Sequence, residues 1–208
     1  MKRVKFAAAV IACMLGGTAA LASAEVATWK FDQAHSEAAF SIRHFFSAVQ
    51  GRFQKMDGSI VFDDKDWSKS SVEATIDAGT IFTNNERRDS HLRTPDFFDV
   101  ADHPTLTFKS TKVTPGKGND FLVEGDLTMR GVTRRVVLEA TFLGAGDVGQ
   151  MGTKAGFTAK TMLSRKDYGI NWNKTLDNGG VMLGDDVAIT LNIEANKVPT
   201  AAAGADAR

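Results

Sequence analysis

Apolar and polar residues alternate with a period of two along most of this chain, and this alternation constrains the fold more than any other feature. The pattern is typical of half-buried β-strands, whose successive side chains point to opposite faces of a sheet. We expect about eight strands, at residues 40–44, 60–62, 72–76, 105–109, 121–129, 132–142, 155–163 and 187–193. Similarly spaced strands joined by loops rich in Gly, Asn and Asp predict an all-β antiparallel barrel or sandwich.

Two dipeptides predict tight turns between these strands. Asp57-Gly58 is a strong signal for a two-residue hairpin, because it favours the positive φ angles that such turns need. Arg130-Gly131 separates two long alternating segments and is expected to reverse the chain there.

Only residues 84–100 interrupt the alternation, with a segment dense in charged side chains. We expect one or two short helices in this segment, inserted between strands. Thr83 or Asn84 is the expected cap of the first helix, and Pro95 is expected to open a second short turn.

The N-terminus has the three parts of a secretory signal. A basic stretch at residues 2–5 precedes an uncharged, mostly apolar run at residues 6–21 and an Ala-Ser-Ala cleavage site at residues 22–24. The apolar run is shorter than the roughly 20 residues that a membrane-spanning helix needs. We therefore expect residues 1–24 to be a cleavable signal peptide.

The remaining chain is expected to form one domain over residues 25–198, with a disordered tail over 199–208. Loss of the signal removes three of the 25 basic residues and none of the 25 acidic ones, which leaves a net charge of −3. A chain without a basic surplus is a poor partner for nucleic acid. The only cysteine, Cys13, leaves with the signal, and no other segment could span a membrane.

Motifs for catalysis and metal binding are missing from the sequence. It contains no Gly-x-Ser-x-Gly nucleophile elbow, and its four histidines, at 35, 44, 91 and 103, lack metal-ligand spacing. We expect no catalytic residues and no metal site. An enzyme, a module that binds a protein partner at a sheet edge, and a homodimer remain open alternatives.

Short motifs occur along the chain in a characteristic order. They are Trp29–Ser36, Phe40–His44, Gly51–Phe53, Asp57-Gly58, Thr83–Asp89, His91-Leu92, Asp96–Val100, His103–Phe108, Gly125–Thr133 and Arg165–Ile170. The ordered set resembles the YceI-like polyisoprenoid-binding proteins over about residues 28–196. One departure is Arg135, where many relatives have proline.

The resemblance implies an extended, lipocalin-like antiparallel barrel of eight strands with a short helical insertion at about residues 84–100. It implies a bound long-chain amphiphile, such as a polyprenyl phosphate or a quinone tail, or a fatty-acid-like molecule as in some members. It implies no further cofactor and no enzymatic activity. The alternative is a lipid-modifying enzyme that acts on the bound isoprenoid or fatty-acid-like amphiphile. A long isoprenoid needs shielding from water, so the export signal suggests a carrier, store or sensor in the periplasm.

Candidate contacts to such a lipid follow from the resemblance and from residue type. Apolar side chains of the strands and the insertion are candidates for the tail: Phe40, Ile42, Phe53, Phe62, Phe97, Phe108, Phe121, Met129 and Phe157. Polar side chains expected near the barrel mouth are candidates for the head group: His35, Ser36, Arg43, His44, Arg87, Asp89, His91, Arg165 and Asp167.

Each of these residues also has a purely structural interpretation. The phenylalanines could simply fill the core, because buried aromatic residues are normal core material. The charged residues could form ion pairs that fix the insertion to the barrel, with Arg87 paired to Asp89 and Arg165 paired to Asp167.

Overall fold

The computed structural model describes residues 26–63, 65–175 and 181–199, so the expected signal peptide and all but the first residue of the expected tail lie outside the described residues. Eleven strands occur in these ranges: β1 (Val26–Phe31), β2 (Glu37–His44), β3 (Ser47–Phe53), β4 (Met56–Asp63), β5 (Ser71–Asp77), β6 (Ile81–Phe82), β7 (Thr105–Pro115), β8 (Asp120–Met129), β9 (Val132–Asp147), β10 (Thr153–Ser164) and β11 (Leu183–Lys197). The helices are α1 (Glu86–Leu92) and four 3₁₀ turns, η1 (Trp67–Lys69), η2 (Ala78–Thr80), η3 (Gly149–Met151) and η4 (Arg165–Tyr168). Within these ranges, no helix combines the length and hydrophobicity that crossing a bilayer needs.

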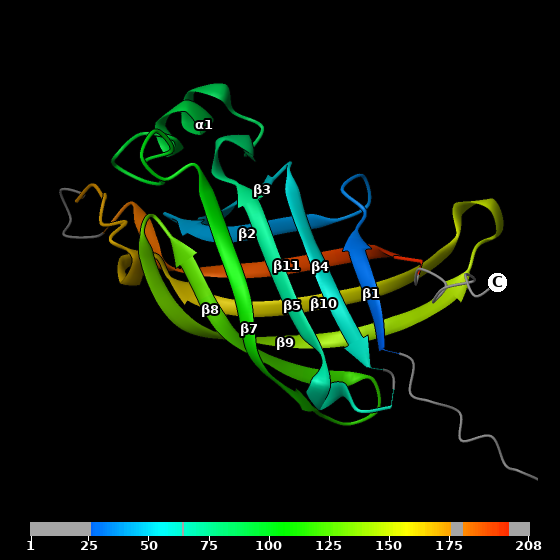
Figure 1. The fold of residues 1–208 in the computed structure, drawn as a ribbon. Coiled ribbons are helices and arrows are strands. Elements are labelled where there is room, and N and C mark those ends of the chain that lie inside the picture. The colour runs from blue at the N-terminus through cyan, green and yellow to red at the C-terminus, as the bar shows by residue number, and fades with distance from the viewer. Residues whose placement is uncertain (1–25, 64, 176–180, 200–208) are drawn as a thin grey trace, which may run out of the picture.

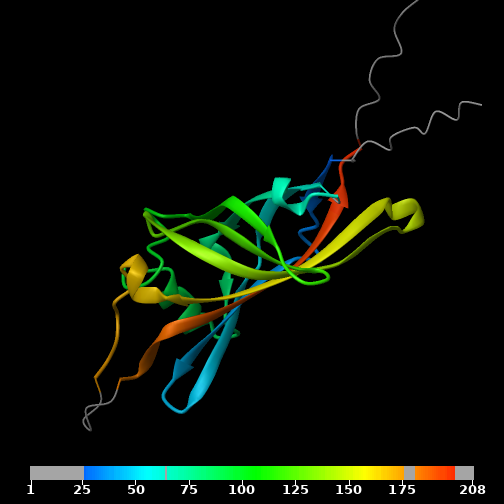
Figure 2. The ribbon, with the colours of Figure 1, turned by 90° about the horizontal axis from the view of Figure 1, so that it is seen from below.

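Eight of the strands form a closed antiparallel barrel, as expected. They pair in the order β1-β4-β5-β7-β8-β9-β10-β11, and the ring closes where β11 pairs with β1 (Figure 1). The other three strands, β2, β3 and β6, lie outside the ring and extend the sheet from β11 in that order. Figure 2 shows the β2–β3 hairpin diverging from the green strands. The predicted strand at 40–44 thus belongs to this extension, and β1 takes its place in the ring.

The core lies inside the barrel because the alternation is in register on neighbouring strands. In β1 the inward residues Ala27, Trp29 and Phe31 are buried, while the residues between them are exposed. In β10 the inward residues Ala155 and Phe157 are buried in the same way. The barrel wall is therefore apolar on its inner face and largely polar on its outer face.

One of the two predicted turns is confirmed. Arg130 and Gly131 connect β8 to β9 with φ angles of 51° and 71°, the left-handed backbone that a two-residue hairpin uses.

The other predicted turn is wrong, because Asp57 and Gly58 lie inside β4. A Cβ atom on Gly58 would lie 2.5 Å from Phe31 Cε2 and 2.6 Å from the carbonyl oxygen of Glu73. The glycine is therefore needed for the close packing of the Phe31 ring against the sheet, and it marks no chain reversal.

The predicted insertion contains one helix, α1, at one end of the barrel (Figure 1). Its cap is Asn85, whose Oδ1 accepts a hydrogen bond from the Arg88 amide at 3.0 Å, so neither Thr83 nor Asn84 is the cap. Asn84 instead takes a φ of 60° and turns the chain just before the helix. The turn at Pro95 is present, closed by the Phe97 amide on the Thr94 carbonyl at 3.0 Å.

Candidate functional site

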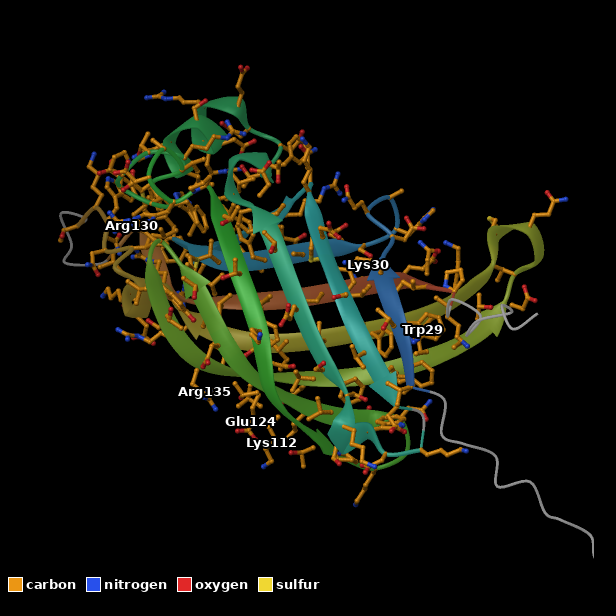
Figure 3. The ribbon with its side chains drawn as sticks, in the orientation of Figure 1. Trp29, Lys30, Lys112, Glu124, Arg130 and Arg135 are labelled. Carbon is orange, nitrogen blue, oxygen red and sulfur yellow. The ribbon has the colours of Figure 1, made fainter. Side chains whose placement is uncertain are left out.

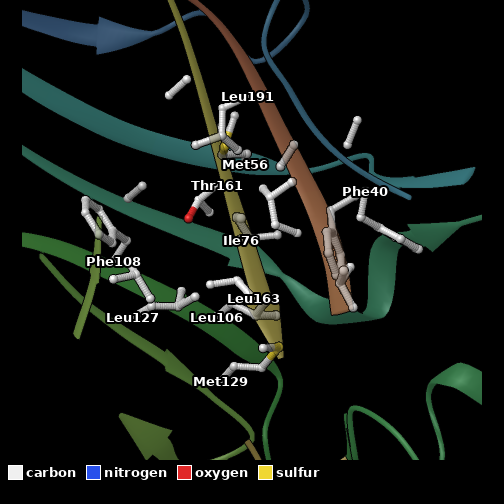
Figure 4. A pocket seen from close by; sticks show the side chains of 18 of the residues that line it. Phe40, Met56, Ile76, Leu106, Phe108, Leu127, Met129, Thr161, Leu163 and Leu191 are labelled. Carbon is white, nitrogen blue, oxygen red and sulfur yellow. The ribbon is translucent and has the colours of Figure 1, made fainter. Parts of the chain in front are cut away.

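The barrel encloses a cavity of about 920 Å³. Its wall is formed mainly by apolar side chains from the inner faces of the strands, several of which appear in Figure 4. All nine residues predicted as tail contacts line this cavity: Phe40, Ile42, Phe53, Phe62, Phe97, Phe108, Phe121, Met129 and Phe157. The phenylalanines therefore surround a space large enough for a small molecule and do not merely fill a solid core.

Aromatic rings cluster away from the insertion, around η1. The Phe62 ring lies 5.1 Å from that of Phe142, 5.8 Å from that of Phe157 and 5.6 Å from that of Trp67. Trp67 could not be selected from the sequence, because it lies in a polar connection between β4 and β5. Its ring contacts place it on the cavity wall beside Phe121.

A second aromatic cluster lies at the insertion end of the cavity. The His91 ring makes edge contacts with Phe97 and Trp172, each at 5.0 Å between centroids, and Phe97 lies 5.2 Å from Trp172. His91 Nε2 also contacts Asp96 Oδ2 at 2.8 Å. Trp172 has no periodic context in the sequence, so only the structure identifies it as part of the cavity.

Charged and imidazole side chains that line the cavity gather at this insertion end. Four of the nine predicted head-group residues are among them: His44, Arg87, His91 and Arg165. Arg88, which is not among the predicted residues, also lines the cavity. The arrangement gives an apolar chamber with basic groups at one end.

Arg165 is held almost entirely by the protein itself. Its side chain is 4% exposed and donates to the carbonyl oxygens of Ile170, Trp172 and Gly184 at 2.7–2.8 Å. Burial lowers its pKa, although the nearby Asp185 carboxylate, 3.3 Å away, opposes this effect. The expected pair with Asp167 is wrong. The donors of Arg165 instead join the end of β10 to the segment that leads to β11.

The insertion is fixed by a buried network. Asp89 accepts hydrogen bonds from the amide and the hydroxyl of Thr83, and Arg88 donates to the Thr83 hydroxyl at 2.7 Å. The expected Arg87–Asp89 pair is therefore wrong, because Asp89 is buried against Thr83. Arg130 completes the attachment by donating to Pro95 and Gly169 carbonyls.

Arg87 differs from the other arginines on the cavity wall, Arg88 and Arg165, which are bonded to the protein. Arg87 is exposed and lines the cavity, and its side chain makes no hydrogen bond or ion pair with any other residue that the structure describes. Its guanidinium group is thus available to an external anion or carbonyl at the mouth.

Five predicted head-group residues lie outside the cavity lining. Arg43 is exposed and donates to the Phe45 carbonyl at 3.0 Å, and Asp167 is exposed on η4. Asp89 is buried in the network described above. His35 and Ser36 lie in the turn between β1 and β2, away from the insertion.

His35 and Ser36 belong to a polar cluster on the barrel wall. Lys154 Nζ lies 2.8 Å from Asp32 Oδ2 and 2.7 Å from Glu194 Oε1, while His35 Nδ1 lies 3.1 Å from Asp32. A hydrogen bond from Lys154 and, to a smaller extent, one from His35 hold the pKa of Asp32 well below its usual range. Asp32, His35 and Glu194 could together hold a metal ion by distance alone, but the Lys154 ammonium already supplies the balancing charge.

A closed antiparallel barrel around an apolar cavity with a basic end defines a class of protein that holds one hydrophobic small molecule. The chain belongs to the YceI-like family, because the model of the YceI-like domain matches residues 29–195.

Relatives and solved structures agree with this assignment. The chain is 42% identical to a UPF0312 protein of Vibrio cholerae over 66% of this chain and 73% of that protein, and 37% identical to one of Staphylococcus aureus over 79% and 94%. Its fold is similar to that of BcnA from Burkholderia cenocepacia, with a TM-score of 0.71, 22% identity and coverage of 80% and 99%. It is also similar to a Campylobacter jejuni YceI protein, with a TM-score of 0.65, 29% identity and coverage of 76% and 91%. A polyisoprenoid binding domain from Saccharophagus degradans shares the fold at 14% identity, with a TM-score of 0.59 and coverage of 84% and 100%.

Proposed function

We propose that the protein binds one long-chain amphiphilic lipid inside the barrel, with its tail in the cavity and its head group at the insertion end. The observation that carries this proposal is the 920 Å³ cavity with its apolar wall. Each methylene transferred from water to such a wall contributes roughly 0.8 kcal/mol. Several isoprene units therefore provide enough free energy to exceed the cost of ordering the chain.

The ligand class is proposed to be a polyisoprenoid, such as a polyprenyl phosphate or an isoprenoid quinone. The name of the Saccharophagus degradans domain, which shares this fold, supports a polyisoprenoid. The free guanidinium of Arg87, together with His44 and His91 on the same cavity wall, supports a head group that accepts hydrogen bonds.

We propose that the protein carries, stores or senses this lipid in the periplasm, after cleavage of residues 1–24, and does not transform it. The signal-like N-terminus supports export. A barrel in the aqueous space between two membranes would shield the apolar tail of the lipid from water.

The experiment is a binding titration of delipidated protein. Trp67 and Trp172 both line the cavity, so their fluorescence should change when a lipid enters, and a quinone ring should quench it. We expect saturable binding of one polyprenyl compound per chain. Absence of binding for polyprenyl phosphates, polyprenols and quinones alike would contradict the proposal.

The role of Arg87 is tested with a matched pair of variants. Arg87→Ala should lower the affinity for a polyprenyl phosphate by about tenfold, because a charge-assisted hydrogen bond is lost. Arg135→Ala removes an arginine from the outer face (Figure 3), where it is paired with Asp126 at 2.9 Å, and should leave binding unchanged. Equal effects of both variants would exclude a specific contact at Arg87.

A further inference from the structure

One polar side chain faces the apolar middle of the cavity. Thr161 lies on the inner face of β10, in the same alternating row as Phe157, Ala159 and Leu163, and its neighbour on β11 is the apolar Ile189. Figure 4 shows the Thr161 hydroxyl pointing into the chamber among aliphatic side chains.

The Thr161 hydroxyl forms no hydrogen bond with any residue in the described part of the chain, and it is only partly buried, so it is reachable from the cavity. Two other hydroxyls on the lining, those of Thr158 and Ser70, are bonded to the protein. Thr158 on the same strand donates to the Leu191 carbonyl at 3.1 Å, and Ser70 accepts from the Asp63 amide at 3.1 Å. Thr161 is therefore the hydroxyl among these that is open to a ligand.

The position of Thr161 separates it from the charged end. Arg165 follows it by four residues, which corresponds to about 13 Å along an extended strand. A charged head group held at Arg87 and the insertion would leave plain hydrocarbon beside Thr161. The hydroxyl would then lose water without gaining a partner, which weakens binding.

We propose that Thr161 is a specificity-determining residue that donates a hydrogen bond to an uncharged oxygen of the ligand inside the barrel. This inference rests on the proposed lipid-binding function and narrows it. The preferred ligand is an isoprenoid with a carbonyl or hydroxyl oxygen, such as a quinone or a polyprenol. For such an uncharged ligand, the oxygen lies deep in the chamber beside Thr161, and this position replaces the one at the insertion end proposed above.

The test compares Thr161→Val, which keeps the shape and removes the hydroxyl, with the matched variant Thr158→Val. The probes are a short-tailed isoprenoid quinone, a polyprenol and a hydrocarbon of similar length. We expect Thr161→Val to lower the affinity for the quinone and for the polyprenol by about tenfold. The affinity for the hydrocarbon should stay the same or increase. Thr158→Val should leave the ratio of oxygenated to hydrocarbon affinity unchanged.

Equal effects on all three probes, or none on the oxygenated ones, would overturn the role of Thr161. Failure of the unmodified protein to bind any probe would instead overturn the proposed function itself. A second measurement needs no variant: the infrared carbonyl band of the bound quinone should shift to lower frequency than in an alkane. An unshifted band would also overturn the inference.

Discussion

The proposed position of the lipid can be tested by filling part of the chamber. Ala159 lies on the inner face of β10, beside Ala140 of β9 and Leu191 of β11, and all three residues line the cavity. In Ala159→Phe a phenyl group would enter the chamber at this point. Because its neighbour Ala140 is also small, the ring meets cavity space before it meets packed side chains.

The magnitude follows from the number of carbons displaced. The added ring takes about the room of one isoprene unit of five carbons. At roughly 0.8 kcal/mol per buried carbon, exclusion of one unit removes about 4 kcal/mol of gross binding free energy. This corresponds to an upper limit of about a thousandfold in affinity, and we expect at least about tenfold, because the lipid can shift along the chamber.

The assay is a titration with a series of polyprenols of increasing length. Affinity for the unmodified protein should rise until the chamber is full, and affinity for Ala159→Phe should stop rising about one unit earlier. The control Ala188→Phe makes the same substitution on β11 at the edge of a small groove lined by Ser41 and Thr190, and it should not change the series.

Thermal unfolding supplies the remaining control. Overpacking a filled core costs about 1–3 kcal/mol, whereas a ring that enters a cavity should cost little. A folded Ala159→Phe variant that keeps full affinity for every length would refute the placement of the tail in this chamber.

Three further predictions concern stability. Tyr168 is 1% exposed, its hydroxyl has no hydrogen-bond partner among the described residues, and burial raises its pKa to about 12. Tyr168→Phe should therefore leave the unfolding free energy unchanged or raise it by about 1 kcal/mol. Denaturant titrations at several pH values should also show that the variant no longer loses stability between about pH 10 and 12. The hydrogen bond between Asp32 and Lys154 is the chief cause of the lowered pKa of Asp32 and the raised pKa of Lys154. The pair should therefore stabilise the fold between about pH 4 and pH 10 and lose this effect outside that window. Lys154→Met should flatten the acid limb of a stability–pH curve, and an unchanged limb would contradict the pairing. Gly58→Ala should destabilise by about 1–3 kcal/mol in denaturant titration, because the methyl group would meet Phe31 and a backbone carbonyl, and a neutral result would refute the close contact.

The strands could be predicted because alternation is a local property of the sequence. Residues 47–53 form β3 yet carry a weak pattern, since the inward position between Val49 and Phe53 is Gly51. A Cβ atom at Gly51 would lie 2.4 Å from Phe40 Cζ, so a neighbouring ring occupies the place that its own side chain would have. The apolar group at this inward position comes from Phe40 on the neighbouring strand, so the sequence of β3 alone does not show the alternation.

The residues predicted for the tail and those predicted for the head group lie differently relative to the cavity, for a physical reason. An inward-facing strand residue is placed on the cavity wall by its alternation, and the eight tail candidates that lie on strands all line the wall. The positions of polar residues in loops are set by hydrogen bonds to backbone groups that are not adjacent in the sequence. Arg165, for example, is satisfied by carbonyls of Ile170, Trp172 and Gly184, and no sequence spacing specifies those contacts.

The most direct test of the central claim is to extract purified protein from its native compartment with organic solvent and identify what is released by mass spectrometry. We expect one long-chain isoprenoid per protein chain, and we expect that molecule to carry an uncharged oxygen. Protein that releases no lipid, and that binds none of the polyprenyl or quinone compounds when they are added, would contradict the account.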